Sequence, residues 1–129
     1  RNADERAVEG LVTAALTLPC LMTRIAINRM RTTMMAGTIL NIATESRRAS
    51  PAARAVAGVA RAALTSMTRT EARAAAADGI RVNAIAPGGP MGARDSALRC
   101  DPDVASLAMH LVSKRGSRLS GLVFEAYAG

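Results

Sequence analysis

Residues 78–91, DGIRVNAIAPGGPM, place a helix stop, a short apolar strand and a glycine-proline loop in immediate succession. Gly79 follows a helical run rich in alanine and arginine, and glycine readily takes the left-handed conformation found after a helix C-terminus. The apolar residues from Ile80 to Ile85 predict a strand, and Pro87 ends it because proline donates no hydrogen bond to a ladder. Ligands of open parallel sheets bind beyond the carboxyl ends of the strands, so we expect a small-molecule site in the loop from Pro87 to Gly92.

The segments around this stretch alternate between helical and strand patterns. From Asp4 to about Arg31 apolar residues recur every three or four positions, which predicts a long helix that Pro19 kinks or splits. Residues 38–43 form a nearly continuous apolar run, typical of a strand covered on both faces. The remaining expected elements are a helix over 52–77 capped by Ser50-Pro51, a helix from Asp101 to about Lys114, and a strand over 122–126.

This order predicts an α/β fold with three parallel strands and long helices, in one domain over residues 1–129. A three-stranded sheet of this kind leaves the strand over residues 38–43 with an open edge. Because open apolar edges pair with other chains, we expect a homo-oligomer or a partner chain to cover it.

The composition favours neither nucleic acid nor a membrane as partner. The net charge is +7, but the 17 basic residues are spread over helical stretches, and Phe124 and Tyr127 are the only aromatic residues on which bases could stack. The longest apolar run, Gly10 to Met22, is interrupted by threonines and a proline and is too short to span a bilayer.

The cysteines indicate a reducing, cytoplasmic location and no metal site. Cys20 lies in a helical run and Cys100 in a loop, so no disulfide framework is expected. Together with His110 they show no spacing typical of metal ligands. We expect His110 to be structural.

The order and spacing of several short segments resemble the second half of the short-chain dehydrogenase/reductase family. The segments that carry the resemblance are GTILNIAT (37–44), AAL (62–64) with Thr68-Arg69, GIRVNAIAPG (79–88), DPDVA (101–105), and LSG (119–121) with VFE (123–125). The resemblance implies a partial Rossmann-like layer fold, with residues 1–129 forming an incomplete domain. Members of the family oxidise alcohols or reduce carbonyls with NAD(P), which a glycine-rich turn in their first half holds. This sequence contains no such turn.

The resemblance also implies catalytic positions, and several are altered here. The family's serine, tyrosine and lysine fall on Thr44, Ala57 and Arg61. Thr44 keeps a hydroxyl that could hydrogen-bond a substrate oxygen, whereas Ala57 has no proton to donate and Arg61 has no phenol whose acidity it could adjust. Glu45 is the best spare acid or base, although a solvated loop carboxylate is the preferred interpretation. Tyr127, the only phenol, falls in the family's terminal loop.

The cofactor positions are matched in part. Pro87 and Gly88 match the loop beside the nicotinamide and are the cofactor-binding candidates. The family's threonine after this loop falls on Gly92, and the asparagine of the preceding helix falls near Ala15.

Two functions are therefore considered. In the first, the chain is a degenerate, catalytically inactive segment that serves as a structural or assembly element. In the second, it is part of an NAD(P)-dependent oxidoreductase, of the carbonyl/alcohol or 3-oxoacyl reductase type, whose nucleotide-binding half is missing or supplied by another chain.

Overall fold

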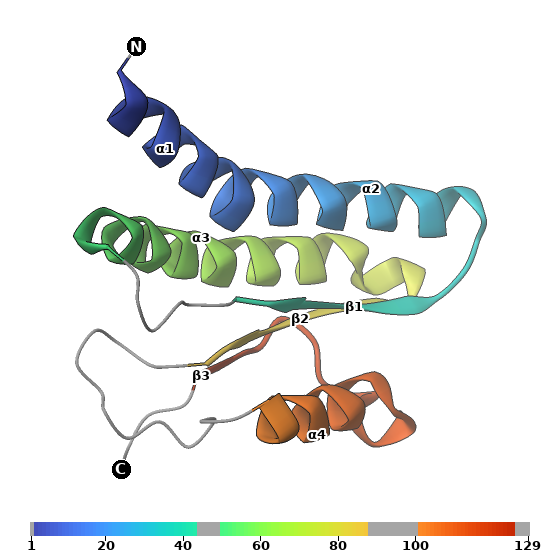
Figure 1. Ribbon diagram of the computed structural model, residues 1–129. Coiled ribbons are helices and arrows are strands. Elements are labelled where there is room, and N and C mark those ends of the chain that lie inside the picture. Colours follow the sequence, from blue (N-terminus) through green and yellow to red (C-terminus); the bar gives the residue numbers. More distant parts are fainter. Residues whose placement is uncertain (1, 44–49, 88–100, 126–129) are drawn as a thin grey trace.

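The computed structural model describes residues 2–43, 50–87 and 101–125, which form three layers (Figure 1). The helices α1, α2 and α3 cover one face of a three-stranded sheet, and α4 covers the other face. In chain order the elements are α1 (Ala3–Val12), η1 (Thr13–Thr17), α2 (Leu18–Thr32), β1 (Gly37–Ile42), α3 (Pro51–Ala75), η2 (Ala76–Asp78), β2 (Ile80–Ala86), α4 (Asp101–Val112), η3 (Lys114–Gly116) and β3 (Val123–Glu125).

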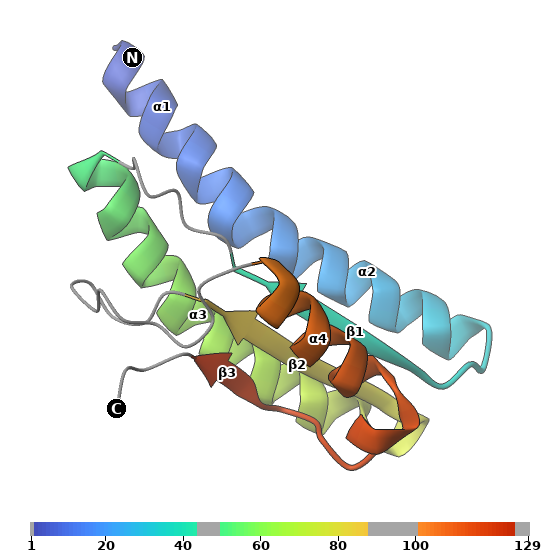
Figure 2. The same cartoon turned by 60° about the horizontal axis from the view of Figure 1, so that its bottom comes forward.

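The sheet is parallel throughout, in the order β1-β2-β3, with β1 and β3 at opposite edges (Figure 2). Gly37 pairs with Ile80, and the register continues until Ile42 pairs with Ile85. The predictions of three parallel strands and of an edge strand near residues 38–43 are both confirmed.

The N-terminal helix bends where Pro19 was expected to disturb it (Figure 1). Pro19 lies in the first turn of α2, and the preceding segment η1 is a π-helix. Proline donates no hydrogen bond and its ring crowds the turn before it, so a wider turn at this point relieves both problems.

The segments α1, η1 and α2 run on as one 30-residue helix that is long and apolar enough to cross a membrane by length and composition alone. The expectation of no membrane partner, drawn from the shorter run Gly10 to Met22, stays a prediction. Core helices and signal sequences have the same properties. Here one ion pair ties α2 to α3 and another ties it to η2. Arg24 Nε lies 3.1 Å from Glu71 Oε1, and Arg31 Nε lies 2.7 Å from Asp78 Oδ2.

Local capping chemistry fixes the start of the long helix α3 and the end of η2, which follows it directly. Ser50 Oγ accepts a hydrogen bond of 3.1 Å from the Ala53 main-chain nitrogen, and Pro51 follows at the first helical position. At the other end Gly79 adopts the left-handed conformation with φ of 69°, as predicted.

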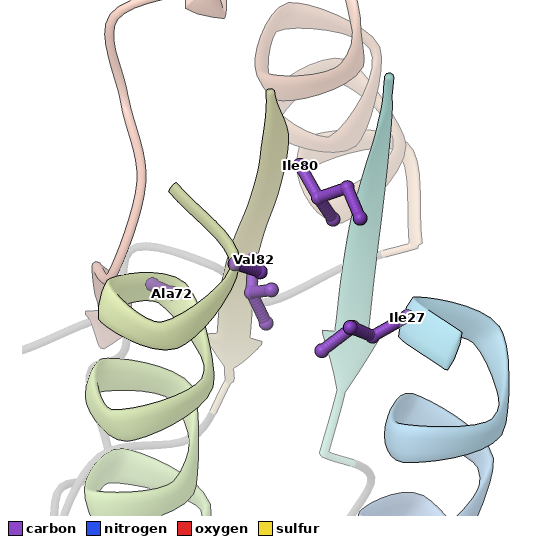
Figure 3. Close-up of a cluster of buried hydrophobic side chains, with 5 residues drawn as sticks. Ile27, Ala72, Ile80 and Val82 are labelled. Carbon is purple, nitrogen blue, oxygen red and sulfur yellow. The ribbon is translucent and has the colours of Figure 1, made fainter. Parts of the chain in front are cut away.

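The apolar core lies between β2 and the helices α2 and α3 (Figure 3). Ile27 of α2, Ala72 of α3, and Ile80 and Val82 of β2 point toward one another and are almost completely buried. Alternate residues of a strand face opposite sides of the sheet. This face of β2 is therefore apolar, and the residues between point to the opposite face.

That other face carries two polar side chains that hold the α4 layer to the sheet. Arg81 Nη1 donates to the main-chain oxygens of Leu111, at 2.8 Å, and Gly116, at 2.6 Å. The buried Asn83 donates from Nδ2 to Leu119 O at 2.8 Å and accepts from Leu122 N at 3.1 Å. These bonds fix the connection that leads from η3 into β3.

Candidate functional site

The carboxyl ends of β1 and β2 lie side by side, where a ligand was expected. The pairing continues one step beyond β1, since Ala43 N donates to Ile85 O at 2.9 Å. The structure describes Ala57, Arg61 and Pro87 at this end. The other predicted positions, namely Thr44, Glu45, Gly88, Gly92 and Tyr127, lie outside the described residues, so their predicted roles stay predictions.

Arg61 reaches from the middle of α3 to the end of β2. Its Nη1 donates to Ala86 O at 2.8 Å and its Nη2 to Pro87 O at 2.9 Å. Glu125 Oε1, at the end of β3, lies 3.8 Å from Nη1. The Arg61 side chain is 18% exposed, and through these contacts it joins α3, β2 and β3 instead of standing free at the crevice. Sequence reasoning missed both the main-chain acceptors and the contribution of Glu125.

Ala57 lies one helical turn before Arg61 and lines a pocket of about 580 Å³. The pocket is bounded by η1 and the start of α2 on one side, by α3 on the other, and by the end of β1. Ala15, near which the resemblance places the family's asparagine, is another lining residue. The packing of η1 against α3 thus brings Ala15 and Ala57 to one pocket, and both present only a methyl group.

The described residues do not fit NAD(P) as a working cofactor. Ala57, on which the resemblance places the family's proton donor, has no proton to give, and the two η nitrogens of Arg61 donate to main-chain oxygens of β2 and its loop.

Among the described residues there is no group of three His, Cys, Asp or Glu side chains placed to hold a metal ion. Cys20 is a half-buried free thiol, and His110 is exposed in the last turn of α4. Neither lines the pocket beside Ala57.

A family model described as enoyl-(acyl carrier protein) reductase matches residues 2–108, which is most of the chain. The chain belongs to the short-chain dehydrogenase/reductase family. The match includes α1 and α2, which lie before the first of the segments that carry the resemblance.

Solved structures with this fold agree with a short-chain dehydrogenase/reductase assignment. They include 4-hydroxyisoleucine dehydrogenase complexed with NADH and succinate, with 24% identity, a TM-score of 0.77, and coverage of 95% of this chain and 58% of that one. A short chain dehydrogenase from Mycobacterium smegmatis has 24% identity, a TM-score of 0.75, and coverage of 99% and 51%. A citronellol catabolism dehydrogenase of Pseudomonas aeruginosa PAO1 has 27% identity, a TM-score of 0.72, and coverage of 93% and 52%.

This short-chain dehydrogenase/reductase chain thus spans little more than half the length of those structures. A search of curated proteins returned no match.

Proposed function

We propose that this chain is a structural or assembly element of a short-chain dehydrogenase/reductase domain and has no oxidoreductase activity by itself. The observation that carries the proposal concerns two residues of α3, Ala57 and Arg61, which lie one helical turn apart. A methyl group stands where the proton donor is needed, and the neighbouring cation is bonded to Ala86 O and Pro87 O. Loss of a general acid alone lowers a rate by about 10²–10⁴-fold.

The assembly role is supported by two exposed features near each other. The outer edge of β1 has no neighbouring strand among the described residues. On α2, the side chains of Leu18, Leu21, Met22 and Ile25 are each about half exposed and recur at helical spacing. An open strand edge and a contiguous apolar stripe are both surfaces that proteins cover by association. We propose that a second copy or a partner chain covers them.

The rival function is an NAD(P)-dependent oxidoreductase, of the carbonyl/alcohol or 3-oxoacyl reductase type, whose nucleotide-binding half lies elsewhere. The family match and the NADH in the 4-hydroxyisoleucine dehydrogenase structure favour it. In that case Thr44 and Arg61 would act in altered roles.

A cofactor titration separates the two functions. The purified chain is titrated with NADH and NADPH by fluorescence and assayed with a ketone substrate, and we expect neither saturable micromolar binding nor turnover. The double variant Ala57→Tyr, Arg61→Lys restores the family residues, and we expect no rescue because the two substitutions supply no nucleotide site. Binding with turnover in the parent chain would refute the proposal, and a rescue would show that the site is otherwise complete.

The assembly role is tested by size-exclusion chromatography with light scattering. We expect an oligomer or a stable complex that Leu21→Glu weakens, because a charge in the apolar stripe must be desolvated on association. Met109→Glu, on the exposed side of α4, is the control and should leave the mass unchanged. A well-behaved monomer of the parent chain would contradict the role.

A further inference from the structure

We propose that a basic surface near the end of the molecule where β1 and β2 begin docks an acidic segment of another protein. The proposal goes beyond the assembly through β1 and α2 and does not depend on it. Five exposed basic residues form this basic surface, namely Arg69, Arg73, Lys114, Arg115 and Arg118. The candidate site lies at the opposite, carboxyl ends of the strands, so the basic surface is separate from it.

The fold gathers basic residues that the sequence keeps apart. Two of the five lie in the second half of α3, and the other three lie in and directly after η3. The segment that follows η3 packs against α3, since a Cβ atom on Gly121 would lie 3.4 Å from Ala72 Cβ and 4.0 Å from Arg69 Cα. Figures 1 and 2 both show η3 and the end of α3 at the end of the sheet where β1 and β2 begin. The two groups of charges therefore belong to one surface.

No carboxylate within the described part of the chain neutralises the basic surface. Its five side chains form no ion pair there. The acidic residues of α3 and η2 are already paired with α2, Glu71 with Arg24 and Asp78 with Arg31. Other acidic residues lie toward the opposite end, in α1, at the start of α4 and at the end of β3, namely Asp4, Glu5, Glu9, Asp103 and Glu125. The positive potential of the basic surface therefore attracts an anionic partner.

Helix polarity explains only part of this charge. The helices α2, α3 and α4 all end here, and basic side chains near a helix C-terminus interact favourably with its dipole. Two other arginines already satisfy main-chain oxygens at these ends, because Arg31 Nη2 donates to Ala74 O at 2.6 Å and Arg81 Nη1 donates to Gly116 O at 2.6 Å. Within the described residues the side chains of the basic surface make no such bond, so they are available to a partner.

The turn that carries three of these charges is held in one conformation. Ser113 Oγ accepts a hydrogen bond of 3.2 Å from Arg115 N, and Arg81 Nη1 donates to Leu111 O at 2.8 Å. Gly116 is buried, and a Cβ atom there would lie 2.5 Å from Leu111 O, so the turn requires glycine. A main chain that is already fixed loses little entropy when a partner binds.

The chemistry of the basic surface favours carboxylates over nucleic acid. Four of its five residues are arginines, whose planar guanidinium groups bind carboxylates through two parallel hydrogen bonds. Arginines bind phosphates too, but phosphate sites commonly add main-chain N–H groups at helix N-termini, and here the helices end. Phe124, the only aromatic residue that the structure describes, pairs with Ile85 near the carboxyl end of β2 and cannot stack on bases here. The partner that fits is a segment rich in aspartate and glutamate.

The test measures the fluorescence anisotropy of a labelled oligoglutamate peptide titrated with the protein. We expect saturable binding that high salt abolishes, because the Debye length falls from about 8 Å at about 0.15 M salt to about 3 Å at about 1 M. The double variant Arg115→Gln, Arg118→Gln should weaken binding about tenfold, which corresponds to about 1.4 kcal/mol. The matched control Arg6→Gln, Arg54→Gln removes the same charge from exposed positions at the opposite end and should leave the affinity within about twofold, because salt screens distant charges.

A second double variant, Arg69→Gln, Arg73→Gln, tests whether α3 belongs to the same surface and should weaken peptide binding by a similar factor. An unchanged affinity for this variant would contradict the surface as defined. The proposal is also overturned if the peptide does not bind saturably, or if the control weakens binding as much as Arg115→Gln, Arg118→Gln does. Tighter binding of duplex DNA than of the peptide at the same salt would assign the surface to nucleic acid instead. Size-exclusion chromatography reports separately on the assembly through β1 and α2, so either idea can fail while the other stands.

Discussion

Replacement of Arg61 by methionine tests whether this residue has become part of the fold. Methionine keeps the aliphatic stem but loses the hydrogen bonds of 2.8 Å to Ala86 O and 2.9 Å to Pro87 O. Hydrogen bonds to charged groups contribute about 1.5–3 kcal/mol each. Water can reach the side chain, which is 18% exposed, so the lower end of that range applies to both bonds. The ion pair with Glu125, at 3.8 Å, adds little. We expect a loss of about 3 kcal/mol in the free energy of unfolding.

The assay is urea unfolding followed by far-ultraviolet circular dichroism. The protein concentration is kept fixed, because association makes the apparent stability depend on concentration. Arg61→Met should lower the urea concentration at the midpoint of unfolding. The slope of the unfolding free energy against urea concentration should not change. Arg69→Met, an exposed position on the same helix, is the matched control and should change the stability by no more than about 0.5 kcal/mol. If both variants lose the same small amount, Arg61 does not hold the site together, and the reasoning that removes it from cofactor binding fails.

Five other substitutions, three tests and two controls, address the buried polar groups and the helix end. Among the described residues Thr68 Oγ1 is buried without a hydrogen-bond partner, so Thr68→Val should raise the unfolding free energy by about 1 kcal/mol. Thr65→Val, which loses a bond to a main-chain oxygen, should not stabilise the chain. Asn83→Ala leaves two main-chain groups of the connection to β3 unpaired and should cost about 2–5 kcal/mol. Asn41→Ala, in the neighbouring strand, loses one side-chain bond and should cost about 1 kcal/mol. Gly79→Ala forces a side chain into the left-handed region and should cost about 1–2 kcal/mol. Urea midpoints measure all five, and a destabilising Thr68→Val or a harmless Asn83→Ala would contradict the assignments.

The parts of the fold that the sequence predicted depend on local chemistry. Gly79 ends a helix because glycine tolerates positive φ, and Ser50 begins one because its hydroxyl caps a free main-chain nitrogen. The bend at Pro19 follows from its missing donor. The π-helical turn before it could not be predicted, since the residues of η1 are ordinary helix formers and the wider turn is only one of the ways to accommodate a proline.

The candidate site was predicted only in its residue types. The spacing from Thr44 singled out Ala57 and Arg61, and the structure describes both near the ends of β1 and β2. The partners of Arg61 are main-chain oxygens, which every residue carries, so no sequence pattern could single them out. Glu125 lies far along the chain and approaches only because β3 pairs with β2. The pocket likewise arises from the packing of η1 on α3, which depends on the three-dimensional arrangement and not on spacing.

The stretch from Gly79 to Gly88 explains why the family likeness says more about the fold than about chemistry. Arg81 and Asn83 bind main-chain groups that lead into β3, so they are required wherever this connection is built. Their loss would leave buried donors and acceptors unpaired, whatever reaction the domain performs. Ala57 is different, because a phenol at that position would serve a substrate and not the packing. A chain that does not catalyse the reaction can therefore keep Arg81 and Asn83 and still lack a phenol at position 57. On this reasoning the recognisable motif is a requirement of the β2–β3 connection, and it carries no information about whether the site beyond Pro87 still works.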